Sequence, residues 1–404
     1  MPASKHLTID LTSGDAGASI RNVIAELKRL PMEQREKPAK ALAVVAERGN
    51  EEIAAILVRE GVISPLVSLL SGFDGGQIHA AQALGHIAAH MRPHRSAIAK
   101  AGALAPLVAL LRTGSNKAQL AAAHAIAAMS QDAEHHRPII KAGGLQPLVR
   151  LLRSGTADAQ VYAASAVAHL ANTFERPEEW EESALTGDVE TQNALAAAGV
   201  IPLLLGMLQT GKTQTAAAEC LARLAAFNPE IQMLIAAEGG VAPLLNLLNS
   251  THVPAQVSAA HAIAELARCN GDNQTAVSRA GGIGPLLSML AATRPQAQAT
   301  ASLALALLAS AHPDNQEHVA VLGGLPKLTA LLATGPTEVQ SMASFALAEI
   351  CRRHARHPSP LLSGVACTHY TCALAPHTAC THHTAHCTWI RGRPPDSARP
   401  PTLT

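Results

Sequence analysis

Residues 206–213 match the nucleotide-binding pattern Gly-x-x-x-x-Gly-Lys-[Ser/Thr], with Gly206, Gly211, Lys212 and Thr213 at its fixed positions. In a true phosphate-binding loop a strand leads into a glycine-rich turn, and free amides at a helix start hold the phosphates. Here Gly206 falls inside a predicted apolar helix, and no strand precedes it. Because the amides inside a formed helix are already paired, we expect no nucleotide at Gly206–Thr213.

Zinc chemistry is a second possibility, because cysteine and histidine crowd into residues 355–404. Thiolate and imidazole are ligands that zinc prefers. However, Cys367 and Cys372 have four residues between them and Cys380 and Cys387 have six, so the two-residue spacing of zinc-binding loops is missing. The composition, rich in Thr, His, Cys and Pro, favours a disordered low-complexity tail. A zinc-binding tail and a gene-model artefact stay open as alternatives.

Histidines recur in the predicted helices, but their spacing does not converge on a reactive site. His79 and His86 are seven residues apart on one helix, which separates them by about 10 Å, whereas zinc ligands lie about 2 Å from the metal. No Ser-His-Asp or Cys-His arrangement stands in a supporting motif. We therefore expect no metal, no cofactor and no enzymatic activity, and we interpret the histidines as solvated.

The composition narrows the class of protein that could carry these residues. Hydrophobic residues make up 48% of the 404 residues, charged residues 15% and aromatic residues 2%. Alanine is the commonest of the apolar residues, which predicts an all-α chain, and the scarcity of aromatic residues disfavours base-stacking nucleic-acid modules. The net charge of +1 gives no general reason to bind nucleic acid or an anionic membrane, although local patches stay possible. No apolar run reaches the 18 or so residues of a membrane span, so we expect no direct membrane insertion and a cytoplasmic location, with a nuclear one also open.

A phrase of the form Gly-x-x-x-Pro-Leu-x-x-Leu-Leu recurs along the chain. Its copies begin at Gly61, Gly102, Gly143, Gly199, Gly239, Gly281 and Gly323, with intervals of 41, 41, 56, 40, 42 and 42 residues, and those at Gly199, Gly281 and Gly323 vary from the pattern at one or more positions. A second phrase, such as Ala83-Leu-Gly-His-Ile-Ala, follows each of them. Every copy has a glutamine nine residues before the fourth position of this second phrase: Gln77, Gln119, Gln160, Gln214, Gln256, Gln298 and Gln340. Such a period indicates repeated supersecondary units.

Each unit is predicted to hold three helices. The glycine ends a short first helix in a left-handed conformation, and the proline opens the second helix. In the third helix Ala83, Leu84, Ile87 and Ala88 form one apolar stripe. One unit cannot bury its apolar faces alone, so the units must stack on their neighbours.

These motifs resemble those of the armadillo-repeat family, which includes β-catenin and many plant and protist adaptors. The resemblance covers residues 18–354 and implies a right-handed superhelical α-solenoid of about seven full three-helix units after an N-terminal half unit. Residues 1–17 are then predicted to be a disordered N-terminus. The third helices of the family line a groove that binds partner proteins.

The resemblance identifies candidate groove residues by their place in the third helix. The family's asparagine position holds His86, Ala128, His169, Arg223, Glu265, Leu307 and Glu349. One turn earlier, where importin-α-like relatives carry tryptophan, stand Gln82, His124, Ser165, Glu219, His261, Leu303 and Phe345. His79, Tyr162 and Met342 complete the face. Because both the asparagines and the tryptophans are missing, a receptor for nuclear-import signals is disfavoured.

The predicted groove changes character along its length. Its early part is rich in histidine, whereas Leu303, Leu307, Met342 and Phe345 form a predicted apolar strip in the last two units. Such a strip would suit a partner's amphipathic helix or apolar peptide. Packing of the strip against the tail or an extra helix is the alternative.

The long interval contains an acidic insertion, predicted to be a surface loop over residues 175–187. Residues 175–190 carry seven acidic residues and one basic residue around Trp180. A solvated insertion is the simplest interpretation, since loop length costs little free energy. A docking peptide for a basic partner, or a segment that folds over the groove, are alternatives.

The function expected from these observations is a non-enzymatic scaffold or adaptor that binds a partner's extended peptide or amphipathic helix. A substrate-binding component of a ubiquitin-ligase assembly is one alternative, because similar plant proteins carry a ubiquitin-ligase domain before their repeats. A cargo or vacuole adaptor is another. We expect neither nucleic acid nor nucleotide as a partner.

Overall fold

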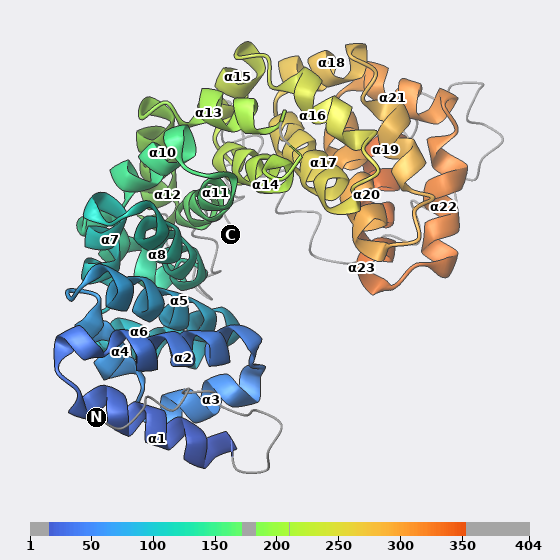
Figure 1. Cartoon of the computed structure of the whole chain (residues 1–404). Coiled ribbons are helices and arrows are strands. Elements are labelled where there is room, and N and C mark those ends of the chain that lie inside the picture. The colour runs from blue at the N-terminus through green and yellow to red at the C-terminus, as the bar shows by residue number, and fades with distance from the viewer. Residues whose placement is uncertain (1–15, 172–182, 210, 353–404) are drawn as a thin grey trace, which may run out of the picture. The chain divides into compact units, whose positions relative to one another are not determined.

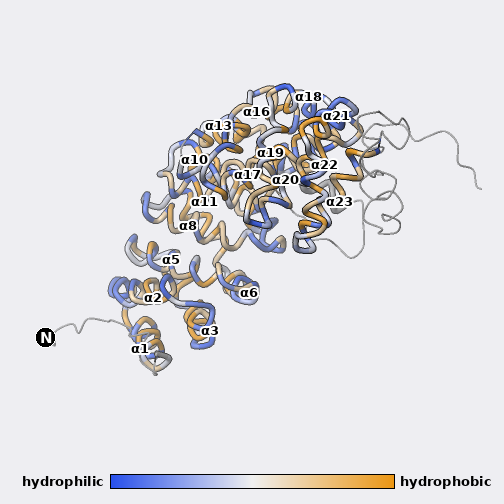
Figure 2. The backbone as a smooth tube through the Cα atoms, turned by 90° about the vertical axis from the view of Figure 1, so that its right-hand side faces the viewer, coloured by the Kyte–Doolittle hydropathy of each residue, from blue (hydrophilic) through white to orange (hydrophobic). Residues whose placement is uncertain are grey.

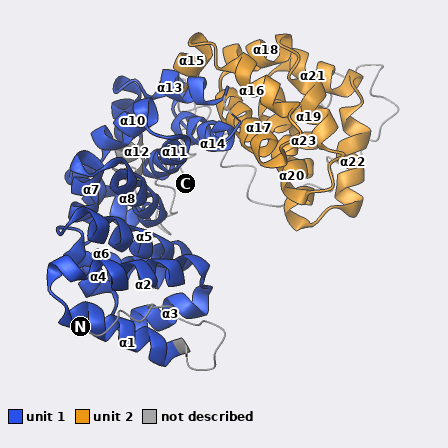
Figure 3. Cartoon of the chain, in the orientation of Figure 1, with its two compact units in different colours: residues 1–231 blue, residues 232–404 orange. Residues whose placement is uncertain are grey.

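The computed structural model describes residues 16–171, 183–209 and 211–352, and every regular element in these ranges is a helix. The chain divides into two compact units, residues 1–231 and residues 232–404 (Figure 3). Unit 1 contains α1 (Ala16–Arg29), η1 (Met32–Gln34), α2 (Glu36–Arg48), α3 (Glu51–Arg59), α4 (Ile63–Leu69), α5 (Asp74–His90), α6 (Arg92–Lys100), α7 (Leu104–Thr113), α8 (Asn116–Met129), η2 (Ala133–His135), α9 (His136–Lys141), α10 (Leu145–Ser154), α11 (Ala157–Leu170), α12 (Ser183–Ala197), α13 (Val200–Met207) and α14 (Gln214–Ala225). After α15 (Pro229–Ala237), at the boundary, unit 2 contains α16 (Val241–Leu248), α17 (Val253–Ala267), α18 (Gly271–Arg279), α19 (Ile283–Met289), α20 (Pro295–Ala309), α21 (Pro313–Val321), α22 (Gly324–Thr334) and α23 (Thr337–Cys351).

The helices after α1 and α2 follow one another in sets of three, as the repeat predicts. In unit 1 the third helices α5, α8, α11 and α14 pack in series after α2. Figure 1 shows α2, α5, α8 and α11 stacked in this order, with α7 and α10 to one side of the stack. In unit 2 the third helices α17, α20 and α23 pack in series. The all-α solenoid predicted from the sequence is therefore confirmed.

Alanine allows the third helices to approach one another closely. On α5 the buried face consists of Ala80, Ala81 and Ala83 together with Leu84 and Ile87, none of which is exposed. Figure 2 shows α11 as largely hydrophobic, whereas the first helices α18 and α21 carry hydrophilic stretches. The alanine excess of the sequence thus lies where small side chains set the helix spacing.

A left-handed glycine ends the first helix of every repeat. The seven glycines of the repeat phrase have φ between 75° and 81°, as the sequence predicts. A side chain at φ of this sign strains the backbone, so glycine is favoured there for conformational reasons. At Gly143 a Cβ atom would meet nothing within 4 Å, so the strain would be purely a backbone effect.

Gly143→Ala is expected to destabilise the protein by about 1 kcal/mol, because alanine disfavours the left-handed region. Gly206→Ala is the matched control, since Gly206 lies inside α13 and its added Cβ would also meet nothing within 4 Å. That change should stabilise by up to about 1 kcal/mol through helix propensity. Urea unfolding followed by circular dichroism measures both, and equal effects of the same sign would contradict this explanation.

The proline of the repeat phrase lies slightly later in the second helix than predicted. Helices α4, α7 and α10 begin at Ile63, Leu104 and Leu145, two residues before the proline. The proline is therefore the third helical residue rather than the first. It is tolerated because the first-turn N–H groups of a helix have no intrahelical partner.

The recurring glutamine joins the second helix to the third. The Nε2 atoms of Gln77, Gln160 and Gln256 donate to the carbonyl oxygens of Leu70, Leu152 and Leu248, over 3.1, 2.9 and 3.0 Å. Each acceptor lies at the end of a second helix, where carbonyls have no partner within the helix. This hydrogen bond gives a physical reason for the fixed offset of the glutamine.

A second set of polar side chains, on the first helices, was not predicted. Seven residues before the left-handed glycine stand Arg95, His136, Gln192, Gln274 and Gln316, all buried. They donate to a carbonyl near the end of the preceding third helix, namely that of Ala88, Ser130, Ala171, Ala267 and Ala309, respectively. Gln274 also donates to the carbonyls of Leu307 and Ser310, over 2.8 and 3.1 Å. These bonds join the third helix of one repeat to the first helix of the next.

The acidic loop predicted over residues 175–187 does not extend to residue 187. Helix α12 begins at Ser183, so residues 183–187 are helical rather than part of a loop. Residues 172–182, with Trp180, lie outside the described residues. So do nearly all of the predicted N-terminal segment 1–17 and the whole tail 355–404, with its cysteines and histidines.

Candidate functional site

Three of the predicted groove residues meet in one row across α5, α8 and α11. The rings of His86 and His124 have centroids 4.6 Å apart in an edge-on arrangement, and those of His124 and Tyr162 lie 4.7 Å apart. All three side chains are half-buried, so part of each ring remains open to solvent. We call His86, His124 and Tyr162 the aromatic row.

Gly85 allows the close approach that forms this row. A Cβ atom at Gly85 would lie 2.7 Å from Nδ1 of His124 and 3.2 Å from the backbone of Ala125. Any larger residue would push α5 away from α8 or displace the His124 ring. Gly85 belongs to the second repeat phrase, but its role in the site was not predicted. The available signal was that the other copies carry a larger residue at this position.

Burial keeps His86 and His124 uncharged at neutral pH. Burial, and then the neighbouring His86, lowers the pKa of His124 to about 4. The pKa of His86 is lowered mainly by its own burial, which Glu47 partly offsets. The aromatic row is therefore a neutral surface whose imidazoles can each donate and accept one hydrogen bond.

His169 continues the predicted face on α11. Its Nδ1 lies 3.3 Å from the hydroxyl of Ser130, which sequence reasoning missed. Burial, and then the positive charge of Arg223, lowers the pKa of His169 to about 4. Arg223 and Glu219, both predicted, form an ion pair on α14 at 2.9 Å.

His79 and Gln82 lie together at the other end of the face. The Nδ1 of His79 is 3.1 Å from Oε1 of Gln82, both on α5. The structure thus places His79, Gln82, the aromatic row, His169, Glu219 and Arg223 on the third helices of unit 1.

Acidification is expected to destabilise unit 1 through His124 and His169. Their pKa is about 4 in the folded chain and about 6.5 in the unfolded chain, so below pH 6.5 the unfolded state binds protons first. Stability should therefore fall as the pH drops from 6.5 towards 4, by about 2 kcal/mol for both groups after allowance for their partial exposure. Urea midpoints at several pH values measure this. The double variant His124→Phe/His169→Gln should flatten the dependence above pH 5, and an unchanged slope would contradict the assignment.

Unit 2 differs from the predicted groove at its acidic positions. Glu265 and Glu349 are 4% and 3% exposed. Glu265 pairs with Arg268 at 2.7 Å, and Glu349 pairs with Arg352. Burial raises the pKa of Glu349, and Arg352 counteracts that shift. Both carboxylates are thus buried and ion-paired near their own helix ends, although Oε2 of Glu349 is buried with no hydrogen-bond partner among the described residues. His261 lies 3.8 Å from Glu265.

The apolar strip predicted in unit 2 is interrupted at Leu307, which is only 4% exposed. Leu303, Met342 and Phe345 are half-buried. Helix α20 packs between α17 and α23 and is apolar on nearly all sides, so it has a narrow open face. The strip is therefore smaller than the sequence suggested.

The residues that match the nucleotide-binding pattern make contacts within the protein. Gly206 lies inside α13, and the segment before it is helical. Nζ of Lys212 is 2.6 Å from Asp158, and the hydroxyl of Thr213 donates to the carbonyl of Met207. In the described part of this region a helix, α13, takes the place of the strand that leads into a phosphate-binding loop, and the absence of nucleotide binding stays a prediction.

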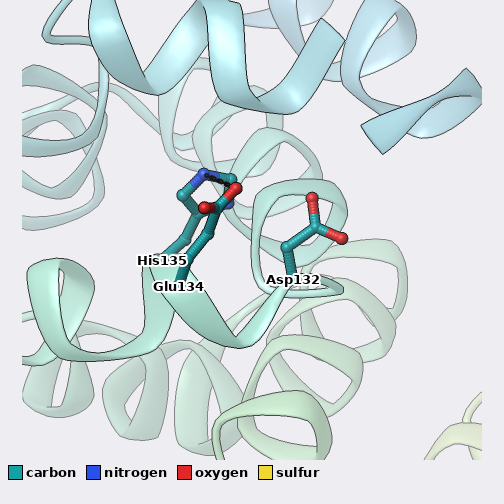
Figure 4. Close-up of side chains that lie close together, drawn as sticks. All are labelled: Asp132, Glu134 and His135. Atoms are coloured by element: carbon teal, nitrogen blue, oxygen red, sulfur yellow. Dashed lines mark ion pairs between the residues drawn. The ribbon is translucent and has the colours of Figure 1, made fainter. Parts of the chain in front are cut away.

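One group of side chains, Asp132, Glu134 and His135, has atoms close enough to share a metal ion. Figure 4 shows Glu134 against the His135 ring, with Asp132 standing apart. Asp132 accepts two hydrogen bonds from Arg95, and Nδ1 of His135 lies 2.9 Å from the Met129 carbonyl. The group is thus accounted for by contacts within the protein.

No single helix among the described residues is long and apolar enough to span a membrane. Three bent pairs of consecutive helices have the necessary length and composition when the two helices of each pair are taken together.

Comparisons with known proteins agree with this architecture. The model of the family described as Armadillo/beta-catenin-like repeat matches residues 136–172. No curated protein matches the chain. An engineered protein of known structure is 32% identical over 62% of this chain and 96% of its own, with a TM-score of 0.54. A designed armadillo repeat protein is 27% identical over 61% of this chain and 99% of its own, with a TM-score of 0.53. Another, solved in complex with the peptide (KR)4, is 25% identical over 61% of this chain and 99% of its own, with a TM-score of 0.51.

Proposed function

Since this chain belongs to the armadillo-repeat family, we propose that it is a non-enzymatic scaffold that binds a partner polypeptide on the third helices of unit 1. The aromatic row carries the proposal. Its three rings come from three successive repeats and are partly open, so one extended peptide can contact all of them. The designed relative that was solved with a peptide supports this mode of binding.

The chemistry of the row favours a peptide with apolar or aromatic side chains. His86 and His124 are held neutral by burial, and Tyr162 adds a third uncharged ring. Such rings provide apolar faces together with hydrogen-bonding edges for a peptide backbone. The carboxylate of Glu219 is already paired with Arg223. A polycationic peptide like that of the designed relative therefore finds little free negative charge on this face.

An extended segment fits this face better than an amphipathic helix does. The row crosses the third helices instead of following one of them, and packed helices lie about 8–10 Å apart. An extended chain advances about 3.3 Å per residue, so side chains two or three residues apart can address successive repeats.

The test begins with peptides selected from a random display library on the full chain. Affinities of a selected peptide are then measured by fluorescence polarisation for the wild type, Tyr162→Ala and Phe73→Ala. Phe73 is 60% exposed and lies outside the row, so it is the matched aromatic control. We expect at least a tenfold loss with Tyr162→Ala, no change with Phe73→Ala, and weaker binding of (KR)4 than of the selected peptide. Equal losses in both variants, or failure to select any peptide, would contradict the proposal.

A further inference from the structure

The charge of the chain is unevenly distributed. Residues 92–153 carry nine Lys and Arg residues but two acidic residues, a net charge of +7, whereas the whole chain carries +1. The rest of the sequence is therefore net negative. This segment forms α6, α7, α8, α9 and α10 of unit 1.

The excess positive charge lies on the surface and is not neutralised there. Arg95 is buried and paired with Asp132, which accounts for one base and one acid. Seven of the other eight cations are exposed and form no ion pair with a described residue: Lys100, Arg112, Lys117, Arg137, Lys141, Arg150 and Arg153. We call these seven residues the basic surface. Glu134 is the one exposed carboxylate in the segment.

The basic surface is built from neighbouring elements of two successive repeats. Lys100 and Lys141 occupy the same repeat position, the last residue of a first helix, and Arg112 and Arg153 share a position near the end of a second helix. Helix α7 contacts both α9 and α10. Six of the seven cations therefore lie on adjoining first and second helices, and Lys117 lies at the start of the third helix α8.

Interaction with the helix dipole explains the positions of some of these cations but not of all. Lysine and arginine at helix C-termini interact favourably with the helix dipole, which suits Lys100, Lys141, Arg112 and Arg153. Lys117 and Arg137, by contrast, are the second residues of α8 and α9, where the dipole disfavours a cation. Such placement is expected if the charge serves an external partner.

We propose that the basic surface of α6–α10 binds an acidic polypeptide segment, separately from the peptide-binding face of the third helices. A surface with uncompensated positive charge attracts a negatively charged partner and accelerates its association. Residues 92–153 contain no Phe, Tyr or Trp, and none of their large hydrophobic side chains is exposed. The Phe, Tyr and Trp rings that stack on bases in single-stranded nucleic-acid sites, and the exposed apolar groups of membrane-surface helices, are thus missing from this segment.

The experiment uses the full chain and a fluorescein-labelled glutamate dodecamer at low ionic strength. Arg150→Glu/Arg153→Glu reverses two charges of the basic surface. Arg279→Glu/Arg294→Glu is the matched control, because both residues are exposed cations of unit 2 and the net charge changes equally. We expect the first double variant to lose about tenfold in affinity and the control to lose less than twofold. Added salt should weaken binding, since the Debye length falls as ionic strength rises.

Other outcomes would overturn the proposal. Equal losses in the two double variants would show that net charge alone attracts the peptide, and absence of binding would remove the site. Tighter, Arg150- and Arg153-dependent binding of a uridine dodecamer or of phosphatidylserine vesicles would assign the surface to another class of partner. Tyr162→Ala should leave glutamate binding unchanged, so failure of the groove proposal and of this one are distinguishable.

Discussion

Arg95→Met is expected to destabilise unit 1 by about 3–5 kcal/mol, because it leaves the buried carboxylate of Asp132 without its charge partner. Nε and Nη2 of Arg95 donate to the two carboxylate oxygens of Asp132 over 2.7 and 2.9 Å. Nη1 also donates to the Ala88 carbonyl and to the Gln131 side chain. Arg95 and Asp132 are 9% and 4% exposed, so little water is available to solvate the remaining charge.

The double variant Arg95→Met/Asp132→Leu separates the loss of the pair from the cost of an orphaned charge. Replacing both partners by apolar residues should restore much of the stability, since no buried charge remains. Unfolding in urea, followed by circular dichroism, measures both variants. A double variant as unstable as the single one would show that the hydrogen bonds of Arg95 to Ala88 and Gln131, not its charge, stabilise the junction.

Features repeated with the same residue type were predictable from the sequence. The left-handed glycines, such as Gly143, and the glutamines, such as Gln160, recur as identical letters at fixed offsets, so the helices and their order followed. The hydrogen bond of Gln160 to the Leu152 carbonyl required the structure.

The buried polar set of the first helices escaped prediction because glutamine recurs in only part of it, at Gln192, Gln274 and Gln316, whereas Arg95 and His136 hold the same position in earlier repeats. Arg95, His136 and Gln274 share a position and a donor function, but not a letter. The shared property is a side-chain N–H that reaches a carbonyl near a third-helix end. A search for identical residues cannot detect such a property.

The candidate site was predictable by position but not by burial. The repeat register places His86, His124 and Tyr162 on one face, whereas their ring contacts depend on the helix spacing that Gly85 permits. Glu265 occupies an equivalent register position and is nevertheless buried against Arg268. Exposure depends on neighbouring helices and side chains, which periodicity within one helix does not encode.

Leu307→Asp is expected to destabilise unit 2 by more than about 4 kcal/mol, because it places a carboxylate at a site that is 4% exposed. Helix α20 packs against α17 on one side and α23 on the other. All residues from Ala304 to Ala309 are buried.

Leu303→Asp provides the matched comparison, one turn earlier on α20. Leu303 is half-buried, so its carboxylate can reach water and the change should cost about 1 kcal/mol. Thermal unfolding followed by circular dichroism distinguishes the two variants. If both were tolerated equally, Leu307 would have to be accessible to solvent, and the continuous apolar strip predicted from the sequence would regain its support. If only Leu307→Asp unfolds the unit, any apolar contact with a partner here must centre on Leu303 and Phe345, and variants of those residues can be used to test it.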